Sequence, residues 1–192
     1  ARSKQFLKVL EDKNQKKVSM VQRVYSQLKS VNLQDSAIIA TSSSQVDMIR
    51  NQISESVPVV VEPERRDTFP AIALSAAYLY SVQEVNEDEV VVVLPVDPYV
   101  DDEFFQTVAN LEDTLVNSDA DLALMGVSPT FPSSKYGYIV PKNEKDSDFS
   151  FVSHFKEKPS EDQAKVLISQ GALWNCGVFA FKLSFIIDMI KD

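Results

Sequence analysis

Residues 89–94 read Glu89-Val90-Val91-Val92-Val93-Leu94, a run of β-branched side chains in which apolar and polar residues do not alternate. A strand with one face in water would alternate, so this run predicts a strand whose two faces are both covered, as in the centre of a parallel sheet. Pro95-Val96-Asp97-Pro98 follows directly. The sequence therefore places the Asp97 carboxylate just past the end of a buried strand.

Helix-like and strand-like patterns alternate on both sides of this run. Apolar residues at three- and four-residue steps predict helices over residues 18–28, 44–53, 68–79 and 101–116. Short apolar runs predict further strands over residues 37–40, 57–61 and 122–127. The alternation indicates an α/β fold with a doubly wound, mostly parallel (mixed) sheet. Ligands of such sheets bind at the carboxyl ends of the strands, where Glu62 and Asp97 both fall.

Composition narrows the class of protein. The chain has 192 residues, of which 44% are apolar, enough for one domain with a single core. Its net charge of −9 argues against a nucleic-acid or membrane surface as partner, so an anionic ligand must be met by a few placed cations. The single cysteine, Cys176, excludes an intrachain disulfide and a cysteine metal cluster, and no signal peptide is recognisable. We expect a cytoplasmic protein.

Charged residues follow two of the predicted strands. The Asp97 carboxylate suits Mg²⁺, a hard cation that prefers oxygen ligands, although an Asp before Pro98 is equally typical of a plain turn. Residues 62–71 place several charges between a strand and a helix start, where acceptors such as Glu62 and Asp67 could bind the donor edge of a purine base. A solvated loop with surface ion pairs is the alternative for that segment.

Residues 155–177 hold the most specific chemistry. After residue 128 the pattern changes, and a polar segment at 142–147 leads into a strand, which predicts a lobe attached to the sheet. Phe155-Lys156-Glu157-Lys158-Pro159 and Trp174-Asn175-Cys176-Gly177 supply a carboxylate, an ammonium and an amide on two strand-like segments joined by a short helix. These groups could bind the hydroxyls and the phosphate of a phosphorylated sugar. A solvated Lys158 and a helix capped by Ser160 are the alternatives.

These segments resemble, in order, the motifs of the sugar-1-phosphate nucleotidylyltransferases, and most closely those of the mannose-1-phosphate guanylyltransferases. The matching segments are Lys4-Gln5-Phe6-Leu7, Glu62-Pro63-Glu64-Arg65-Arg66-Asp67-Thr68-Phe69-Pro70-Ala71, Leu94-Pro95-Val96-Asp97-Pro98, Lys135-Tyr136-Gly137-Tyr138-Ile139, Phe155-Lys156-Glu157-Lys158-Pro159 and Trp174-Asn175-Cys176-Gly177. Six segments in the right order across nearly the whole chain are far more specific than any one of them. The resemblance implies a Rossmann-like nucleotidyltransferase (GT-A-like) fold.

The resemblance also implies a reaction and roles for individual residues. A sugar 1-phosphate, here mannose 1-phosphate, attacks the α-phosphorus of GTP to give GDP-mannose and pyrophosphate, with Mg²⁺ as cofactor. The implied catalytic residues are Lys4, Asp97, which would hold Mg²⁺, and Lys158. The implied nucleotide-binding residues are Glu62, Arg66, Asp67, Thr68 and Pro95. The implied sugar-phosphate-binding residues are Gly137, Glu157, Lys158 and Asn175.

Several positions depart from the family pattern. Asp67 stands where the family has Asn, and Pro98 stands where it has His. These changes keep open two alternatives: another sugar 1-phosphate as substrate, or a catalytically silent nucleotide-sugar-binding homologue. The family's glycine-rich loop and its second metal-binding Asp are not among residues 1–192. We expect residues 1–192 to be one catalytic domain without that loop and without its C-terminal end, inactive alone, with a homodimer as a further possibility.

Overall fold

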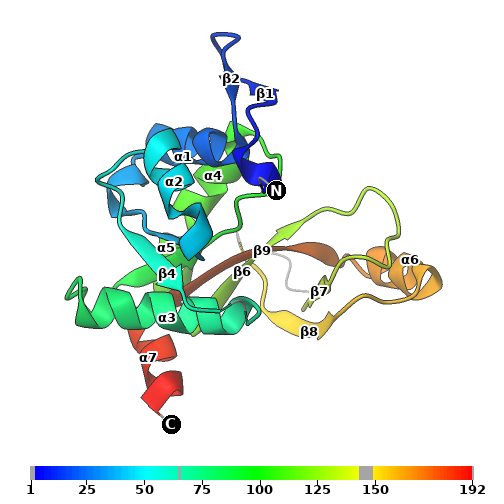
Figure 1. Cartoon of the computed structure of the whole chain (residues 1–192). Helices are drawn as coiled ribbons and strands as arrows, with labels where there is room; N and C mark the ends of the chain where they lie inside the picture. The colour runs from blue at the N-terminus through cyan, green and yellow to red at the C-terminus, as the bar shows by residue number, and fades with distance from the viewer. Residues whose placement is uncertain (1–2, 65, 143–148, 192) are drawn as a thin grey trace.

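The computed structural model describes residues 3–64, 66–142 and 149–191, so most of the polar segment 142–147 lies outside the described residues. The helices are α1 (Met20–Ser30), α2 (Val46–Gln52), α3 (Thr68–Ser81), α4 (Asp102–Ala109), α5 (Leu111–Val116), α6 (Glu161–Ser169) and α7 (Leu183–Lys191), with 3-10 turns η1 (Lys4–Phe6), η2 (Gln34–Ser36) and η3 (Ser43–Gln45) (Figure 1). The strands are β1 (Leu10–Glu11), β2 (Lys17–Val18), β3 (Ile39–Ser42), β4 (Val59–Glu62), β5 (Val90–Val93), β6 (Leu122–Val127), β7 (Tyr138–Pro141), β8 (Val152–Lys156) and β9 (Leu173–Lys182).

Strand β9 organises the larger sheet. Its second half lies between β5 and β6 and is antiparallel to both, so that Val91 and Leu122 both face Phe181 across the ladder. Because β5 and β6 flank the same antiparallel strand, they run parallel to each other. A second, two-stranded sheet pairs β3 with β4 in parallel. The α/β class with a mixed sheet is confirmed, whereas the expected parallel neighbour of β5 is replaced, among the described residues, by the antiparallel β9.

Helices cover both faces of β5. Val91 and Val93 pack against the cluster formed by α3, α7 and β9, which contains Ala76 and Ile186. Val90 and Val92 pack on the other side against a cluster that includes Val108 of α4. The prediction that both faces of this strand are covered is confirmed. A run of valines suits this position because β-branched side chains fill both faces of a pleated strand.

A lobe made of β7, β8 and α6 projects from the body (Figure 1). The first half of β9 pairs with β7, so one strand of 10 residues belongs to both body and lobe. Tyr138 is fully buried in the lobe, and its hydroxyl donates to the Ser133 carbonyl at 3.0 Å. Ser160 caps α6, as the sequence allowed, and it does so in a capping box with Gln163. The lobe is therefore continuous with the sheet, as the sequence indicated.

Some predicted boundaries are wrong. The helix expected over residues 101–116 is broken at Asn110 into α4 and α5. Helix α3 begins at Thr68, as expected, but Asp67 occupies the capping position and makes no side-chain cap bond.

None of the helices in the described part of the chain has the length and apolar character that a membrane crossing requires.

A substitution in β6 tests the β6–β9 packing. A Cβ atom at Gly126 would lie 2.7 Å from the Leu173 Cβ, an atom that cannot move without the backbone. We expect Gly126→Ala to lower the free energy of unfolding by about 1–3 kcal/mol, measured by urea denaturation. Gly171→Ala is the control, because a Cβ there meets no atom within 4 Å. Any loss of stability in this variant comes only from placing alanine at a φ of +80°. Equal stability of Gly126→Ala and wild type would contradict the packing described.

Candidate active site

Lys4 and Asp97 meet although 93 positions separate them in the chain. The Lys4 Nζ lies 3.4 Å from the Asp97 Oδ2, and the two side chains are 80% and 56% exposed. Asp97 lies in the loop between β5 and α4, past the carboxyl end of β5. An exposed ion pair of this kind contributes little to stability, so both groups are available to a ligand.

The side-chain amides of Gln45 and Gln52 hold the turn that carries Lys4. The Gln45 side chain, itself buried, donates from Nε2 to the Ser3 hydroxyl at 2.9 Å. The Gln52 Nε2 donates to the Phe6 carbonyl at 3.1 Å, while its Oε1 accepts from the buried Ser19 hydroxyl at 2.6 Å. Phe6 is buried among apolar residues of α1 and α2. The base of the flexible Lys4 side chain is therefore fixed on both sides.

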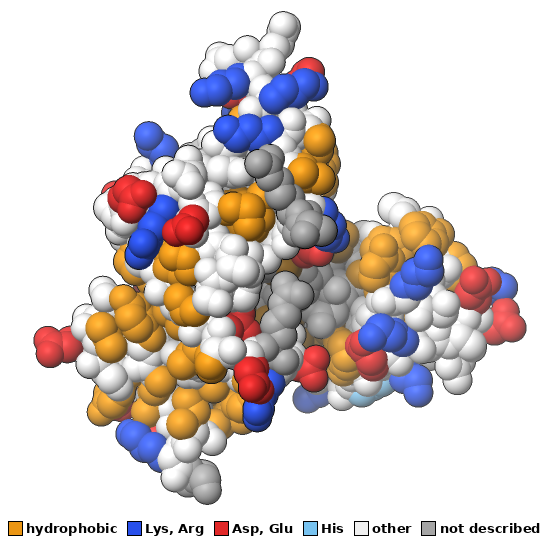
Figure 2. Space-filling view, viewed as in Figure 1, with side chains coloured by type: hydrophobic (Ala, Val, Ile, Leu, Met, Phe, Trp, Pro, Cys, Tyr) orange, Lys and Arg blue, Asp and Glu red, His pale blue; other side chains and the backbone are white. Residues whose placement is uncertain are grey.

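A second group of predicted site residues meets at the junction of body and lobe. The Asn175 N–H donates to the Gly137 carbonyl at 2.9 Å, and the Asn175 Oδ1 accepts from the Gly177 N–H at 3.0 Å. A Cβ at Gly137 would lie only 2.7 Å from the Glu157 Oε2, so the carboxylate lies directly over this glycine. Glu157 in turn pairs with the Lys158 Nζ at 3.0 Å. Figure 2 shows charged side chains of both signs along this junction.

Pro95 connects the two groups. Gly177 has a φ of +77°, and a Cβ there would lie 3.6 Å from the Pro95 Cγ. Pro95 is two residues before Asp97, and Gly177 is two residues after Asn175. The segment that carries Asp97 therefore lies against the strand that carries Asn175.

A pocket of about 490 Å³ lies where β4 meets α3. Its lining comprises Glu62, Pro63, Glu64, Arg66, Pro70, Ala71 and Leu74. The Arg66 guanidinium donates to the Glu64 Oε2 at 2.8 Å, and Asp67 and Thr68 are exposed beside the pocket without lining it. Within the described residues, no hydrogen bond or ion pair joins this pocket to Asp97 or Lys158. Two of the five predicted nucleotide residues, Glu62 and Arg66, thus share one wall.

Two site residues have strained backbones. Lys158 has a φ of 42° and Asp67 a φ of 63° with ψ of −170°, regions that residues other than glycine rarely adopt. Proline at position 159 restricts Lys158 further. Such strain is retained where the surrounding structure imposes it, and it concentrates at ligand sites.

Two other side chains have structural roles, and a third, His154, is exposed. Trp174 packs with Tyr138 and the other residues of the lobe core. Burial raises the pKa of the Cys176 thiol, which donates to the Met125 carbonyl at 3.0 Å. The thiol is therefore protonated at neutral pH and a poor nucleophile. His154 lies on β8, with its Nδ1 3.4 Å from the Ser153 hydroxyl.

Sequence reasoning missed the polar side chains that position the site. Gln27 is buried on the apolar face of α1, three residues after the buried Val24. Gln45 is buried at the start of α2 and reaches Ser3. A polar residue within an apolar stripe is a signal that the sequence does contain, because burying an amide without partners is costly. Its partners, however, lie far away in the chain.

The acidic side chains do not form a closed metal site. In residues 3–64, 66–142 and 149–191, no three His, Cys, Asp or Glu side chains gather closely enough to hold a metal ion. Asp97 offers a single exposed carboxylate. A cation bound there would need its remaining ligands from water and from the substrate, which is how proteins commonly hold Mg²⁺ beside phosphates.

The mixed sheet, with exposed cations and carboxylates gathered at its edge, is typical of α/β enzymes that handle phosphorylated ligands. The chain belongs to the nucleotidyl transferase family, whose model, described as "Nucleotidyl transferase", matches residues 1–191.

Curated relatives match most of the chain. It is 34% identical over 150 residues to "Alginate biosynthesis protein AlgA" of Pseudomonas fluorescens, and this alignment covers 76% of the chain and 30% of that protein. It is 31% identical over 195 residues to "Mannose-1-phosphate guanylyltransferase RfbM" of Salmonella typhimurium, and this alignment covers 98% of the chain and 39% of that protein. The chain thus spans well under half the length of these relatives.

A solved structure has the same fold. A Thermus thermophilus protein named "mannose-1-phosphate geranyltransferase" superposes with a TM-score of 0.78 and 25% identity, covering 97% of the chain and 56% of that protein. This likeness supports the Rossmann-like nucleotidyltransferase fold that the sequence predicted.

The strain at Lys158 gives a prediction about stability. Glycine adopts positive φ without cost, whereas alanine retains the strain, so Lys158→Gly should be more stable than Lys158→Ala by about 1 kcal/mol. Lys156, in the regular strand β8, is the matched control. There the order should reverse, with glycine less stable by about 0.5–1 kcal/mol. Urea denaturation of the four variants measures both differences, and glycine less stable at both positions would contradict the strain at Lys158.

Proposed function

We propose that this chain is the nucleotidyl-transfer part of a magnesium-dependent mannose-1-phosphate guanylyltransferase. A phosphate oxygen of mannose 1-phosphate would attack the α-phosphorus of GTP, the bond from that phosphorus to the bridging oxygen would break, and GDP-mannose and pyrophosphate would form. The observation that carries the proposal is the meeting of Lys4 with Asp97, together with the group formed by Gly137, Glu157 and Asn175 on the lobe side of the Pro95–Gly177 contact. The names of several relatives support the choice of substrates.

Charge neutralisation is the chemistry required at Lys4 and Asp97. Two anionic reactants must approach each other in a protein of net charge −9, so the reaction depends on a few well-placed cations. Lys4 would exchange its exposed partner Asp97 for the phosphates of the nucleotide. Asp97 would hold Mg²⁺ together with those phosphates. When bound, Mg²⁺ supplies further neutralisation of the transferred phosphate.

The lobe would bind mannose 1-phosphate. Lys158 is exposed and could leave Glu157 for the sugar phosphate. Glu157 and Asn175 would accept and donate hydrogen bonds at the sugar hydroxyls. Gly137 has no Cβ, which leaves room for the Glu157 carboxylate directly above its backbone, where the carboxylate would accept hydrogen bonds from the sugar.

The nucleotide would lie along the segment between β4 and α3. Glu62 and Arg66 line its pocket, and Asp67, Thr68 and Pro95 would complete the nucleotide contacts. Acceptors such as Glu62 and Asp67 suit the donor edge of guanine. A homodimer, a cytoplasmic location and the absence of nucleic-acid or membrane partners stay predictions from the sequence.

The overall reaction is tested with the native full-length protein. We expect GDP-mannose from GTP and mannose 1-phosphate, with slower turnover of ATP, UTP and dTTP, as measured by product chromatography. Efficient use of another sugar phosphate at fixed GTP would support the first alternative. Tight GDP-mannose binding without turnover of any nucleotide would reject the enzyme and support the silent homologue, which the replacement of His by Pro98 favours.

Substitution of the proposed metal ligand tests its role. Asp97→Asn should lower kcat/KM by at least about 100-fold, because a group that neutralises charge in the transition state is lost. The protein should still unfold at the wild-type temperature, since the Lys4–Asp97 pair is exposed. Asp88→Asn, an exposed carboxylate before the amino end of β5, is the matched control and should retain activity. Retained activity of Asp97→Asn would remove Asp97 from the metal site.

Two substitutions test the sugar-phosphate side. Lys158→Ala should raise KM for mannose 1-phosphate about 10-fold, the loss of one charged hydrogen bond. Gly137→Ala should raise the same KM, because the new Cβ would displace the ends of the Glu157 and Phe155 side chains. KM for GTP should change little in either variant. An unchanged KM for mannose 1-phosphate in both variants would contradict the proposed location of the sugar.

A further inference from the structure

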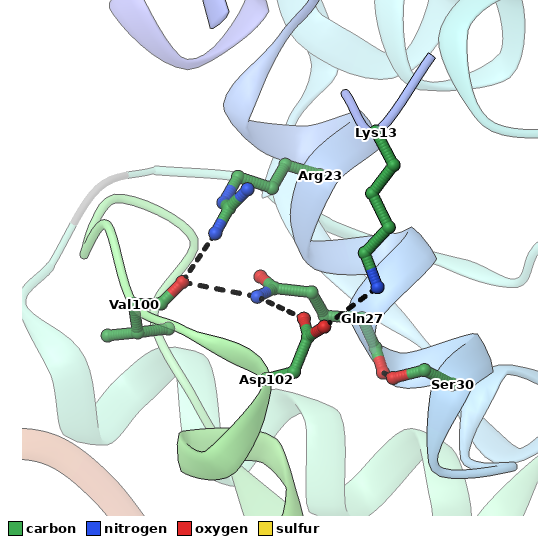
Figure 3. A network of polar contacts seen from close by, with 6 residues as sticks. All are labelled: Lys13, Arg23, Gln27, Ser30, Val100 and Asp102. Carbon is green, nitrogen blue, oxygen red and sulfur yellow. Dashed lines mark hydrogen bonds and ion pairs between the residues drawn. The ribbon is translucent and has the colours of Figure 1, made fainter. Parts of the chain in front are cut away.

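The loop that carries Asp97 is fixed on both sides of that residue. On one side, Val96 packs against the apolar cluster that contains Phe6 and Ile49. On the other side, the Val100 carbonyl accepts two hydrogen bonds from α1: one from the Arg23 Nη2 at 2.6 Å and one from the Gln27 Nε2 at 3.1 Å. Figure 3 shows both side chains reaching from α1 toward this one carbonyl oxygen. Asp97 thus lies between two anchors.

Further contacts tie the same segment to α1. The Arg23 guanidinium stacks 4.4 Å from the centre of the Tyr99 ring. The Gln27 Nε2 also donates to the Asp102 Oδ1 at 3.2 Å, and Lys13 donates to the Asp102 Oδ2 at 3.0 Å. The Lys13 bond, followed by that from Gln27, lowers the pKa of the Asp102 carboxyl. The carboxylate therefore stays ionised, as an acceptor for both donors, at neutral pH.

These contacts leave buried polar atoms without partners. Within the described residues, the Arg23 Nε and the Gln27 Oε1 are buried and make no hydrogen bond. Gln27 as a whole is only 6% exposed. Burying an unpaired donor or acceptor opposes folding, which offsets part of what the other polar atoms of Arg23 and Gln27 contribute. The atoms of these two side chains that do form hydrogen bonds share one acceptor, the Val100 carbonyl.

We propose that Arg23 and Gln27 are positioning residues that hold the loop 94–101, and with it the Asp97 carboxylate, in the geometry needed for nucleotidyl transfer. The proposal rests on the function proposed above. Neither side chain would contact substrate. A misplacement of about 1 Å can slow an enzymatic step by about 100-fold, so a loop held at one anchor instead of two would be a poor support for Asp97.

Gln27→Met and Arg23→Met test the proposal, because both keep an apolar stem and remove the donors to Val100. We expect amide hydrogen exchange of residues 97–101 to become faster in both variants, without substrates or metal. We also expect kcat to fall about 10- to 100-fold, and more Mg²⁺ to be needed for half-maximal rate, while KM for mannose 1-phosphate stays within about twofold. Gln27→Met should unfold close to the wild-type temperature, since the loss of two hydrogen bonds is offset by the removal of an unpaired buried amide oxygen.

Lys13→Met is the matched control. It removes only the exposed contact to Asp102, in which the lysine side chain is 88% exposed, and leaves both bonds to Val100. We expect exchange of residues 97–101 and kcat to match wild type. The same loss in Lys13→Met as in Gln27→Met would overturn the special role of the Val100 bonds.

The remaining outcomes separate this proposal from the proposed function. Unchanged exchange of residues 97–101 in both Met variants would overturn the anchoring. Faster exchange with unchanged kcat would overturn the positioning role. Wild-type protein without turnover of any nucleotide and sugar phosphate would contradict the proposed function and, with it, the catalytic purpose of the anchor, whereas hydrogen exchange would still decide whether Arg23 and Gln27 hold the loop.

Discussion

The pairing of β9 with strands of both the body and the lobe is the constraint on which the rest of the structure depends. Its second half is hydrogen-bonded between β5 and β6, and its first half pairs with β7. Asn175 and Gly177 lie in this strand, so the ladder sets their position relative to Pro95 and Gly137. The candidate site residues of body and lobe are therefore held relative to each other by one hydrogen-bonded strand.

Exposure and burial are divided clearly between the groups that would do chemistry and those that hold them. The pairs Lys4–Asp97 and Glu157–Lys158 are at least half exposed and contribute little to stability. They can therefore exchange partners for a phosphate or a cation at small cost. The amides of Gln27 and Gln45 are buried and bind backbone or neighbouring side chains. Rigid buried amides thus support flexible exposed charges.

Positive φ values occur both at the candidate site and in ordinary turns of the chain. Lys158 and Asp67 have positive φ at the two ends of the candidate site. Both are exposed, and both belong to segments that the family motifs identify. The remaining described residues of this kind other than glycine, Gln15, Asn32 and Glu84, lie in the hairpin turn or after helices, where such φ values are ordinary. Lys158 and Asp67 lie instead in connections from a strand to the following helix, and their strain is one reason for proposing ligand contacts there.

The sequence by itself determined the features that depend on neighbouring residues. Four consecutive valines indicated a strand covered on both faces, Ser160 was available to cap a helix, and Asp97 had to follow a strand. The ordered motifs also identified most of the candidate site. Only the tertiary structure decided that β9 enters between β5 and β6, that Lys4 meets Asp97, and that Arg23 and Gln27 bind the Val100 carbonyl. Such contacts join residues far apart in the chain, so they form only when the whole core packs. Secondary-structure propensities and helix caps, by contrast, depend on residues within a few positions of one another.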